Sequence, residues 1–286
     1  MNSALLGSVA ALAWGTHDFL ARFASRSAGP VNTVFGVTFA GFVALSLWLL
    51  VSGTKIEIIW PSLWLAAVSG IGVAVATLSL FTALTLGPIS IVCPIAASYP
   101  AVAVLLAVIA GVRPDLMEWA AMGAVLLGVI AVAASSAEEP DSDGHVRGKL
   151  APILFFSMLA SLGFAVALAT GQAAAPIFGD AQSVWLARIF GLATVALLYL
   201  APRVRWDVPG RWLPVIGVMG GLDVVALVST FAAGHLPDPT IATVTSSAFG
   251  AVTVLLARLI LKERITIMQL AGMVLVFAGV GVLASH

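Results

Sequence analysis

Long apolar runs, separated by short groups of glycine, proline and charged residues, dominate the chain. An α-helix needs about 20 apolar residues to cross the hydrocarbon core of a membrane, and the separators divide the sequence into ten runs of roughly that length. The predicted spans are 3–22, 31–52, 62–86, 90–112, 115–135, 150–174, 180–202, 211–234, 239–261 and 266–284. The pattern therefore predicts an all-α integral membrane protein with ten transmembrane helices.

The second half of this pattern repeats the first. Residues 70–107 and 220–257 align without a gap at a constant separation of 150 positions, and fourteen of the thirty-eight pairs are identical. A match of this length indicates two homologous halves, which we place at 1–135 and 150–286. Because each half has an odd number of spans, the second half enters the membrane from the opposite side. The expected fold is two inverted five-helix repeats around a central cavity, as in many transporters.

A polar stretch separates the two halves. Residues 136–149 contain acidic, proline and glycine residues, which are typical of a flexible linker. Across the predicted loops, ten basic residues lie on the side of this linker, and only Lys55 and Arg113 lie on the other. Because basic loops stay in the cytoplasm, we expect a cytoplasmic linker and both termini outside. The protein is then a multi-pass protein of the cell inner membrane.

Composition supports the membrane interpretation and excludes several functions. Hydrophobic residues make up 61% of the chain and charged residues 9%, with a mean hydropathy of +1.11, whereas about a quarter of the residues in soluble domains are charged. A net charge of zero leaves no basic surface for nucleic acid. Cys93 is the only cysteine, and no nucleotide loop or metal-spaced histidine cluster occurs. We therefore expect no cofactor, and a monomer whose partners are a small-molecule substrate and membrane lipids.

Local signals mark where spans begin and where they bend. Thr266 and Gln269 are spaced as a capping box for the last span, and Asp115 with Glu118 occupies the corresponding place in the first half. Prolines gather at or before the fourth and ninth spans, among them Pro94. A proline inside a span frees a backbone carbonyl, which is tolerated beside a cavity or a neighbouring helix. These spans are predicted to kink, either for packing alone or for substrate contact.

Several motifs resemble one family of transporters. The motif positions are 14–15, 185–188, 261–266, 269–270, 272 and 278–280. The groups from 261 onward resemble the closing signature of the EamA family in the drug/metabolite transporter superfamily. The first half departs from the pattern, because 111–114 replaces a Gly-Glu-Arg type of turn and the second span lacks an arginine to match Arg188. The resemblance implies a ten-helix exporter of small metabolites, often amino acids, with YddG-type exporters of aromatic amino acids as one candidate relative.

Three ionisable residues inside predicted spans are candidates for function: Asp18, Arg188 and Asp223. A charge within the bilayer is costly unless it is paired or hydrated. The positions of Arg188 and Asp223 along the seventh and eighth spans place them at similar depth. We predict that they face each other near the cavity and either neutralise one another or hold the carboxylate and amine of a zwitterionic ligand. The alternative is a structural ion pair that fixes two helices.

His17 and Asp18 form a second candidate group near the cytoplasmic end of the first span. Histidine changes charge near neutral pH, so the two residues are predicted to form a titratable couple that lines the inner vestibule. The alternative is an ordinary ion pair between Asp18 and Arg22, one helical turn later.

The polar groups are not duplicated in the repeat. Asp223 corresponds to Val73, and an alignment of 14–15 with 162–163 places two apolar residues opposite the histidine and aspartate of the first span. A site that occupies one wall of a symmetric scaffold would leave this pattern.

Aromatic and hydroxyl side chains complete the set of candidates. Trp14, Tyr99, Trp185 and Phe249 are predicted cavity walls, and Tyr99 and Phe249 are related by the repeat. The alternative is that they pack against helices or lie at the membrane interface. Ser246 belongs to a series of hydroxyl residues along the ninth span. Such hydroxyls contact a substrate or bond to a helix instead.

The favoured function is a secondary transporter that exports small metabolites, in the first instance amino acids and among them aromatic ones, by alternating access of the cavity. The candidate substrate-binding residues are Trp14, His17, Asp18, Tyr99, Trp185, Arg188, Asp223 and Ser246. One alternative is a proton-coupled exporter of hydrophobic cationic drugs, which is favoured if Asp223 is unpaired. Two further alternatives belong to a different functional class: a lipid-handling scaffold and an intramembrane enzyme. We do not expect an enzyme, because no nucleophile and base lie close together in the sequence.

Overall fold

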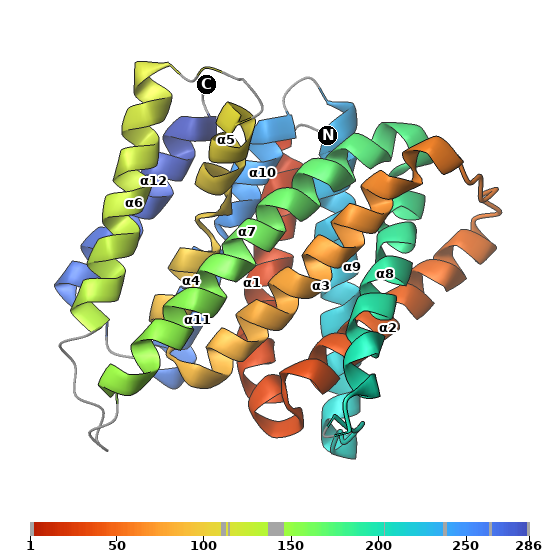
Figure 1. Cartoon of the computed structure of the whole chain (residues 1–286), viewed down its shortest axis with the longest axis horizontal. Helices are drawn as coiled ribbons and strands as arrows, with labels where there is room; N and C mark the ends of the chain where they lie inside the picture. The colour runs from red at the N-terminus through yellow and green to blue at the C-terminus, as the bar shows by residue number, and fades with distance from the viewer. Residues whose placement is uncertain are drawn as a thin grey trace.

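The computed structural model describes residues 3–109, 113, 115–136, 146–202, 204–236, 239–262 and 265–284, and every regular element within them is helical (Figure 1). The longer helices of the first half are α1 (Ser3–Ala28), α2 (Pro30–Val51), α3 (Leu63–Leu86), α4 (Ile89–Ala96), α5 (Tyr99–Ile109) and α6 (Leu116–Ser136). Those of the second half are α7 (Val146–Phe178), α8 (Asp180–Ala196), α9 (Leu213–Ala232), α10 (Pro239–Ser247), α11 (Phe249–Leu256) and α12 (Ile267–Ala284).

The helices lie along the predicted apolar runs, and several of their ends differ from the predicted bounds. The first predicted span, 3–22, continues as α1 to Ala28, because residues 23–28 contain no proline or glycine. The helix α7 begins at Val146, within the predicted linker 136–149. The central part of that linker, 137–145, lies outside the described residues.

Six segments within the described residues are long and apolar enough to cross a membrane. They are Pro30–Val51, Trp60–Leu86, Ile89–Leu106, Leu150–Phe178, Asp180–Leu200 and Gly210–Ala232. Three shorter apolar helices accompany them, at Leu116–Val132, Thr245–Leu261 and Ile267–Val282. Length and composition therefore support a membrane protein with many spans.

The fourth and ninth predicted spans are each broken into two helices. In the first half α4 ends at Ala96 and α5 begins at Tyr99; in the second half α10 ends at Ser247 and α11 begins at Phe249. One cause is Pro100, which lacks the N–H that a continuous helix would need at this position. The predicted bends are thus short breaks of one or two residues, and they lie 150 residues apart.

The two interruptions pack against each other. A Cβ atom added to Gly250 would lie 2.8 Å from the Cβ atom of Ala97 and 3.0 Å from the carbonyl oxygen of Cys93. Only glycine allows this close approach of α11 to α4.

Two capping boxes begin α6 and α12, as the sequence predicts. The backbone N–H of Asp115 donates to Glu118 Oε2 at 2.8 Å, and the N–H of Glu118 donates to Asp115 Oδ1 at 2.8 Å. The N–H of Thr266 donates to Gln269 Oε1 at 3.0 Å, and the N–H of Gln269 donates to Thr266 Oγ1 at 3.1 Å. Each box satisfies helix-end amides that have no partner within the helix.

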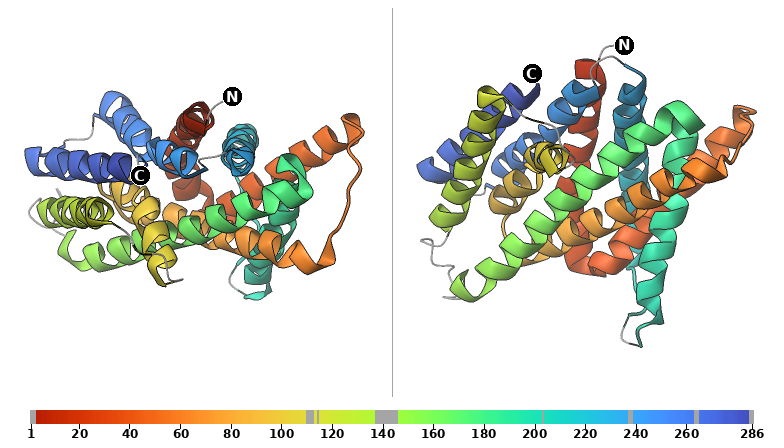
Figure 2. Two further views of the ribbon diagram at one scale, coloured as in Figure 1. Left: turned by 90° about the horizontal axis from the view of Figure 1, so that it is seen from above. Right: turned by 45° about the horizontal axis from the view of Figure 1, so that its top comes forward.

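Helices of one half pack mainly on helices of the other. α3 contacts α7 and α8, α9 contacts α1 and α2, and α6 lies beside α12 at one edge of the molecule (Figure 2). Figure 1 shows both marked chain ends at the same edge. The core therefore forms between the halves and not separately within each.

Close glycine contacts occur twice with the same spacing. A Cβ atom on Gly70 would collide with the carbonyl oxygen of Ala187, and one on Gly220 would lie 2.8 Å from the carbonyl oxygen of Val37. Both partners of the first contact thus recur 150 positions away in the second. These glycines let α3 approach α8 and let α9 approach α2.

Two glycine turns repeat in the same way. Gly29, between α1 and α2, has φ 83° and ψ 151°, and Gly179, between α7 and α8, has φ 83° and ψ 154°. This region of backbone conformation is open almost only to glycine. The spacing of 150 positions therefore extends back to the first helix of each half.

Candidate functional site

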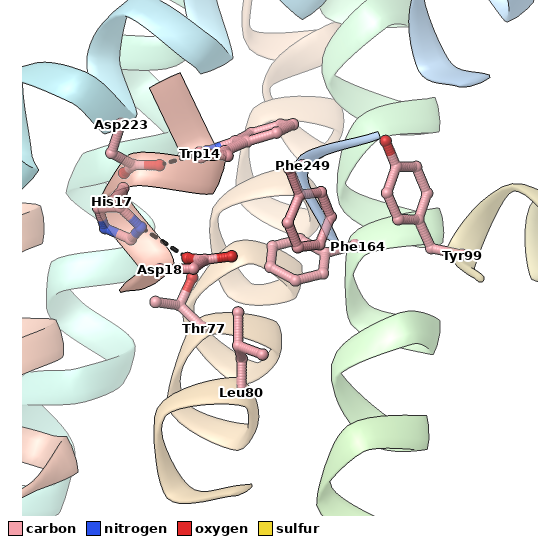
Figure 3. A pocket seen from close by; sticks show the side chains of 9 residues that line it. All are labelled: Trp14, His17, Asp18, Thr77, Leu80, Tyr99, Phe164, Asp223 and Phe249. Carbon is pink, nitrogen blue, oxygen red and sulfur yellow. Dashed lines mark hydrogen bonds and ion pairs between the residues drawn. The ribbon is translucent and has the colours of Figure 1, made fainter. Parts of the chain in front are cut away.

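A small cavity lies at the centre of the bundle (Figure 3). Its lining residues come from six helices and are Trp14, His17, Asp18, Thr77, Leu80, Tyr99, Phe164, Asp223 and Phe249. The centre of a water molecule can occupy about 10 Å³ of it, which is close to the space that one water needs. The predicted central cavity is therefore present but too small for an amino acid in this conformation.

Four aromatic rings form one wall, and they make two repeat-related pairs. The ring centroids of Trp14 and Phe164 are 6.3 Å apart, and those of Tyr99 and Phe249 are 6.4 Å apart with planes only 12° from parallel. The members of each pair are separated by 150 positions. Corresponding residues of the two halves thus meet at the centre of the molecule.

Arg188 and Asp223 form an ion pair behind this wall. Arg188 is 3% exposed, and its Nη2 donates to Asp223 Oδ2 at 2.8 Å. The other carboxylate oxygen of Asp223 accepts a hydrogen bond of 2.9 Å from the indole N–H of Trp14. The prediction that Arg188 and Asp223 face each other across two spans is confirmed. Gly41 of α2 makes room for the guanidinium, since an added Cβ atom would lie 2.5 Å from Arg188 Nη1.

His17 and Asp18 form a second buried pair at the cavity. His17 Nδ1 lies 2.7 Å from Asp18 Oδ1, and the two residues are 2% and 3% exposed. The alternative pairing of Asp18 with Arg22 is wrong, because Arg22 instead donates to the carbonyl oxygen of Gly87 at 2.7 Å. His17 Nε2 is buried and has no hydrogen-bond partner within the part of the chain that the structure describes.

Three predicted site residues do not line the cavity. Trp185 lies away from the cavity in this conformation: its ring stacks on Phe42 and its N–H donates to Ser46 Oγ at 2.9 Å, both on α2. Arg188 reaches the cavity only through Asp223. Ser246 lies behind Tyr99, with 2.6 Å between the two hydroxyl oxygens.

Thr77, Leu80 and Phe164 line the cavity although the sequence did not single them out. Phe164 was detectable, because the constant spacing of 150 positions pairs it with Trp14. Aligning 14–15 with 162–163 shifts the first helix by two positions and hides that pair. At the constant spacing of 150 positions, Ala167 and Leu168 correspond to the histidine and aspartate of α1. The second half therefore still lacks these polar groups.

Comparison with known proteins agrees with this architecture. One solved structure, described only as "Crystal structure of protein", superposes with a TM-score of 0.67 at 20% sequence identity, and the match covers 98% of this chain and 95% of that chain. At this identity the likeness shows a shared fold. No curated protein gives a significant match.

The family comparison is more specific. The model of the EamA-like transporter family matches residues 1–134 and 151–285. The members of this family are transporters, which excludes the intramembrane enzyme considered above. The chain belongs to the EamA-like transporter family and is a multi-pass membrane transporter of small molecules.

Proposed function

We propose that residues 1–135 and 150–286 are two inverted repeats of five spans each, joined by the linker 136–149. Support comes from features that recur at one constant spacing: the broken helices, the glycine turns and the close glycine contacts. An inverted repeat gives a transporter two states related by exchange of conformation between its halves. The cavity then opens to each side of the membrane in turn.

The proposed substrates are small metabolites, and within them amino acids with aromatic side chains. The observation that carries this proposal is that aromatic rings from both halves and buried charged groups converge on one cavity. Aromatic faces suit an apolar or aromatic substrate body. Asp223 and Arg188 would bind the substrate's amine and carboxylate when their ion pair opens, and export is the expected direction.

Roles follow from position. Trp14, Tyr99 and Phe249 form walls, and His17 with Asp18 forms the polar side. Ser246 would orient Tyr99 through its hydroxyl. The list of candidate contacts also includes Trp185, which would contact a substrate only after α8 moves away from α2.

The mechanism requires the site to widen, since about 10 Å³ admits one water and no amino acid. The interruptions between α4 and α5 and between α10 and α11 lie beside the aromatic rings. These interruptions provide natural hinges, because a broken helix can bend without losing regular hydrogen bonds. The protein is proposed to act in the cell inner membrane with both termini outside, as a monomer.

Transport by the purified protein in liposomes tests the function. We expect saturable uptake of radiolabelled phenylalanine or tryptophan, competed by other aromatic amino acids and reduced at least tenfold by Trp14→Ala, about the effect of 1.4 kcal/mol in binding. Leu12→Ala is the matched control, because Leu12 lies on the same helix but is 62% exposed on its outer side. Absence of saturable uptake of any amino acid would contradict the proposed substrate class.

The same assay tests the two alternative functions. A multidrug exporter was expected only if Asp223 is unpaired, but this carboxylate is bonded to Arg188 and Trp14. Substrate-independent redistribution of labelled lipid would favour a lipid-handling protein.

A further inference from the structure

The buried charges around the cavity do not balance unless one more positive charge is present. When both are ionised, Asp18 and Asp223 contribute two negative charges, and Arg188 contributes one positive charge. One additional proton on the His17–Asp18 pair, whose Nδ1 and Oδ1 atoms are 2.7 Å apart, brings the total charge to zero. The cluster therefore has a net charge of −1 or zero, depending on a single proton. An unbalanced charge at this depth is costly, because the interior of a membrane protein solvates ions poorly.

In the described part of the chain, no other charged group around the His17–Asp18 pair is available to neutralise its negative charge. The charged groups that face it are Asp223 from α9 and Arg188 from α8, which are bonded to each other. α3 contributes Thr77, Leu80 and the ring of Phe81, and within the described residues no further acidic or basic side chain lines the cavity.

Asp18 also faces the aromatic wall. Figure 3 shows its carboxylate between His17 and the rings of Phe164 and Phe249. A carboxylate beside aromatic faces is the chemistry that recognises an ammonium group. A cation bound here would supply the missing positive charge, and a proton on His17 would supply it equally well.

Resting on the function proposed above, we propose that His17 and Asp18 hold one exchangeable proton, which a singly charged organic cation displaces and a zwitterion does not. The free His17 Nε2 takes up the proton while Nδ1 stays bonded to Asp18. When the ammonium group of a cation binds at Asp18, His17 releases that proton and the net charge stays at zero. A zwitterion brings its own carboxylate, so His17 keeps the proton.

The test uses the full chain in liposomes with the membrane potential clamped at zero. The probes are phenyltrimethylammonium, whose fixed charge prevents it from crossing as a neutral amine, and phenylalanine. With a pH gradient of one unit, one-for-one exchange should concentrate the cation about tenfold on the acidic side, since each pH unit corresponds to 1.36 kcal/mol. The pH gradient should not change the distribution of phenylalanine between the two sides.

Single variants distinguish loss of the proton site at His17 from the loss of any other histidine. His17→Gln should abolish the gradient-driven accumulation of the cation, and Asp18→Asn should abolish binding of the cation. His235→Gln is the matched control, because His235 is exposed and pairs with Asp180 away from the cavity. Size-exclusion elution and thermal unfolding confirm that each variant is folded.

A binding measurement keeps the proposal testable without transport. In detergent, a pH indicator should record about one proton released per bound phenyltrimethylammonium by the unmodified protein, and none by His17→Gln. Failure of the cation to bind, or binding without proton release, overturns the proton site. Saturable phenylalanine uptake together with such a failure leaves the amino-acid transport function standing, whereas absent uptake of both probes counts against that function.

Discussion

Four positions around the site carry an ionisable residue in one half and an uncharged residue in the other. The corresponding pairs are His17 and Ala167, Asp18 and Leu168, Asp223 and Val73, and Arg188 and Thr38. α1 and α9 thus present ionisable groups where α7 and α3 present apolar ones, although the glycine contacts and the helix breaks are common to both halves. Under the proposed repeat, the scaffold is present in duplicate while the charged groups belong to one wall. Chemistry and architecture can therefore be perturbed separately.

Removal of a single buried charge should have the largest effect. Arg188→Met leaves Asp223 buried without its ion-pair partner, which should cost about 3–5 kcal/mol of folding stability. Thr38→Val, at the repeat position of Arg188, should cost less than about 1 kcal/mol. Thermal unfolding in detergent measures both. Equal destabilisation by the two variants would contradict the proposal that Arg188 and Thr38 differ in their structural role.

A charge-swap variant then distinguishes scaffold from ligand site. Arg188→Asp combined with Asp223→Arg should restore folding by re-forming the pair but should not restore transport, because the substrate's amine and carboxylate would meet the wrong charges. Recovery of both expression and flux would show that the pair serves only the scaffold.

Trp14→Phe makes the two members of this repeat-related pair identical, because Phe164 corresponds to Trp14. The variant removes the indole N–H that donates to Asp223, and a hydrogen bond to a charged group contributes about 1.5–3 kcal/mol. We expect lower stability and weaker transport. Phe164→Trp is the converse control and should not rescue the loss, since no carboxylate stands at residue 73. Unchanged unfolding of Trp14→Phe would contradict the assigned bond.

Equivalent glycine substitutions in the two halves should reduce folding stability by similar amounts. Gly70→Ala and Gly220→Ala each push a Cβ atom into the backbone of the neighbouring helix, so each should cost about 1–3 kcal/mol. Gly221→Ala, which meets nothing within 4 Å, should be neutral or stabilising. Unfolding curves in detergent compare the three, and sensitivity at only one of the first two positions would argue against equivalent packing.

The smallest effect is expected at the hydroxyl behind the aromatic wall. Tyr99→Phe produces the residue type found at its repeat position, Phe249, and removes the contact with Ser246. A neutral hydrogen bond contributes about 0.5–1.5 kcal/mol. We expect a small loss of stability with transport retained, and a complete loss of flux would instead place the hydroxyl in direct contact with the substrate.

The sequence predicted the helices well, because span length and capping follow from local composition. Asp115 and Thr266 mark helix starts that the structure reproduces. The two-residue break near Pro100 could be predicted only as a bend, since a proline does not reveal whether a helix kinks or ends. Its counterpart at Ala248 has no proline at all and shows only in the three-dimensional packing.

The site was predicted less completely, because side-chain partners depend on helix rotation. Arg188 and Asp223 were expected to meet, since unpaired charges are too costly inside a membrane. Trp185, one turn from Arg188, was assigned to the cavity, but its face of α8 turns toward α2. Leu80 carried no signal, because an aliphatic cavity wall resembles any other apolar position.

Accessibility labelling of repeat-related loops tests the central claim most directly. Lys55 and Arg205 are 150 positions apart and exposed. In a background with Cys93→Ala, a membrane-impermeant maleimide on intact cells should label Lys55→Cys at once and Arg205→Cys only after permeabilisation. Labelling of both positions from the same side would contradict the inverted arrangement on which the transport mechanism depends.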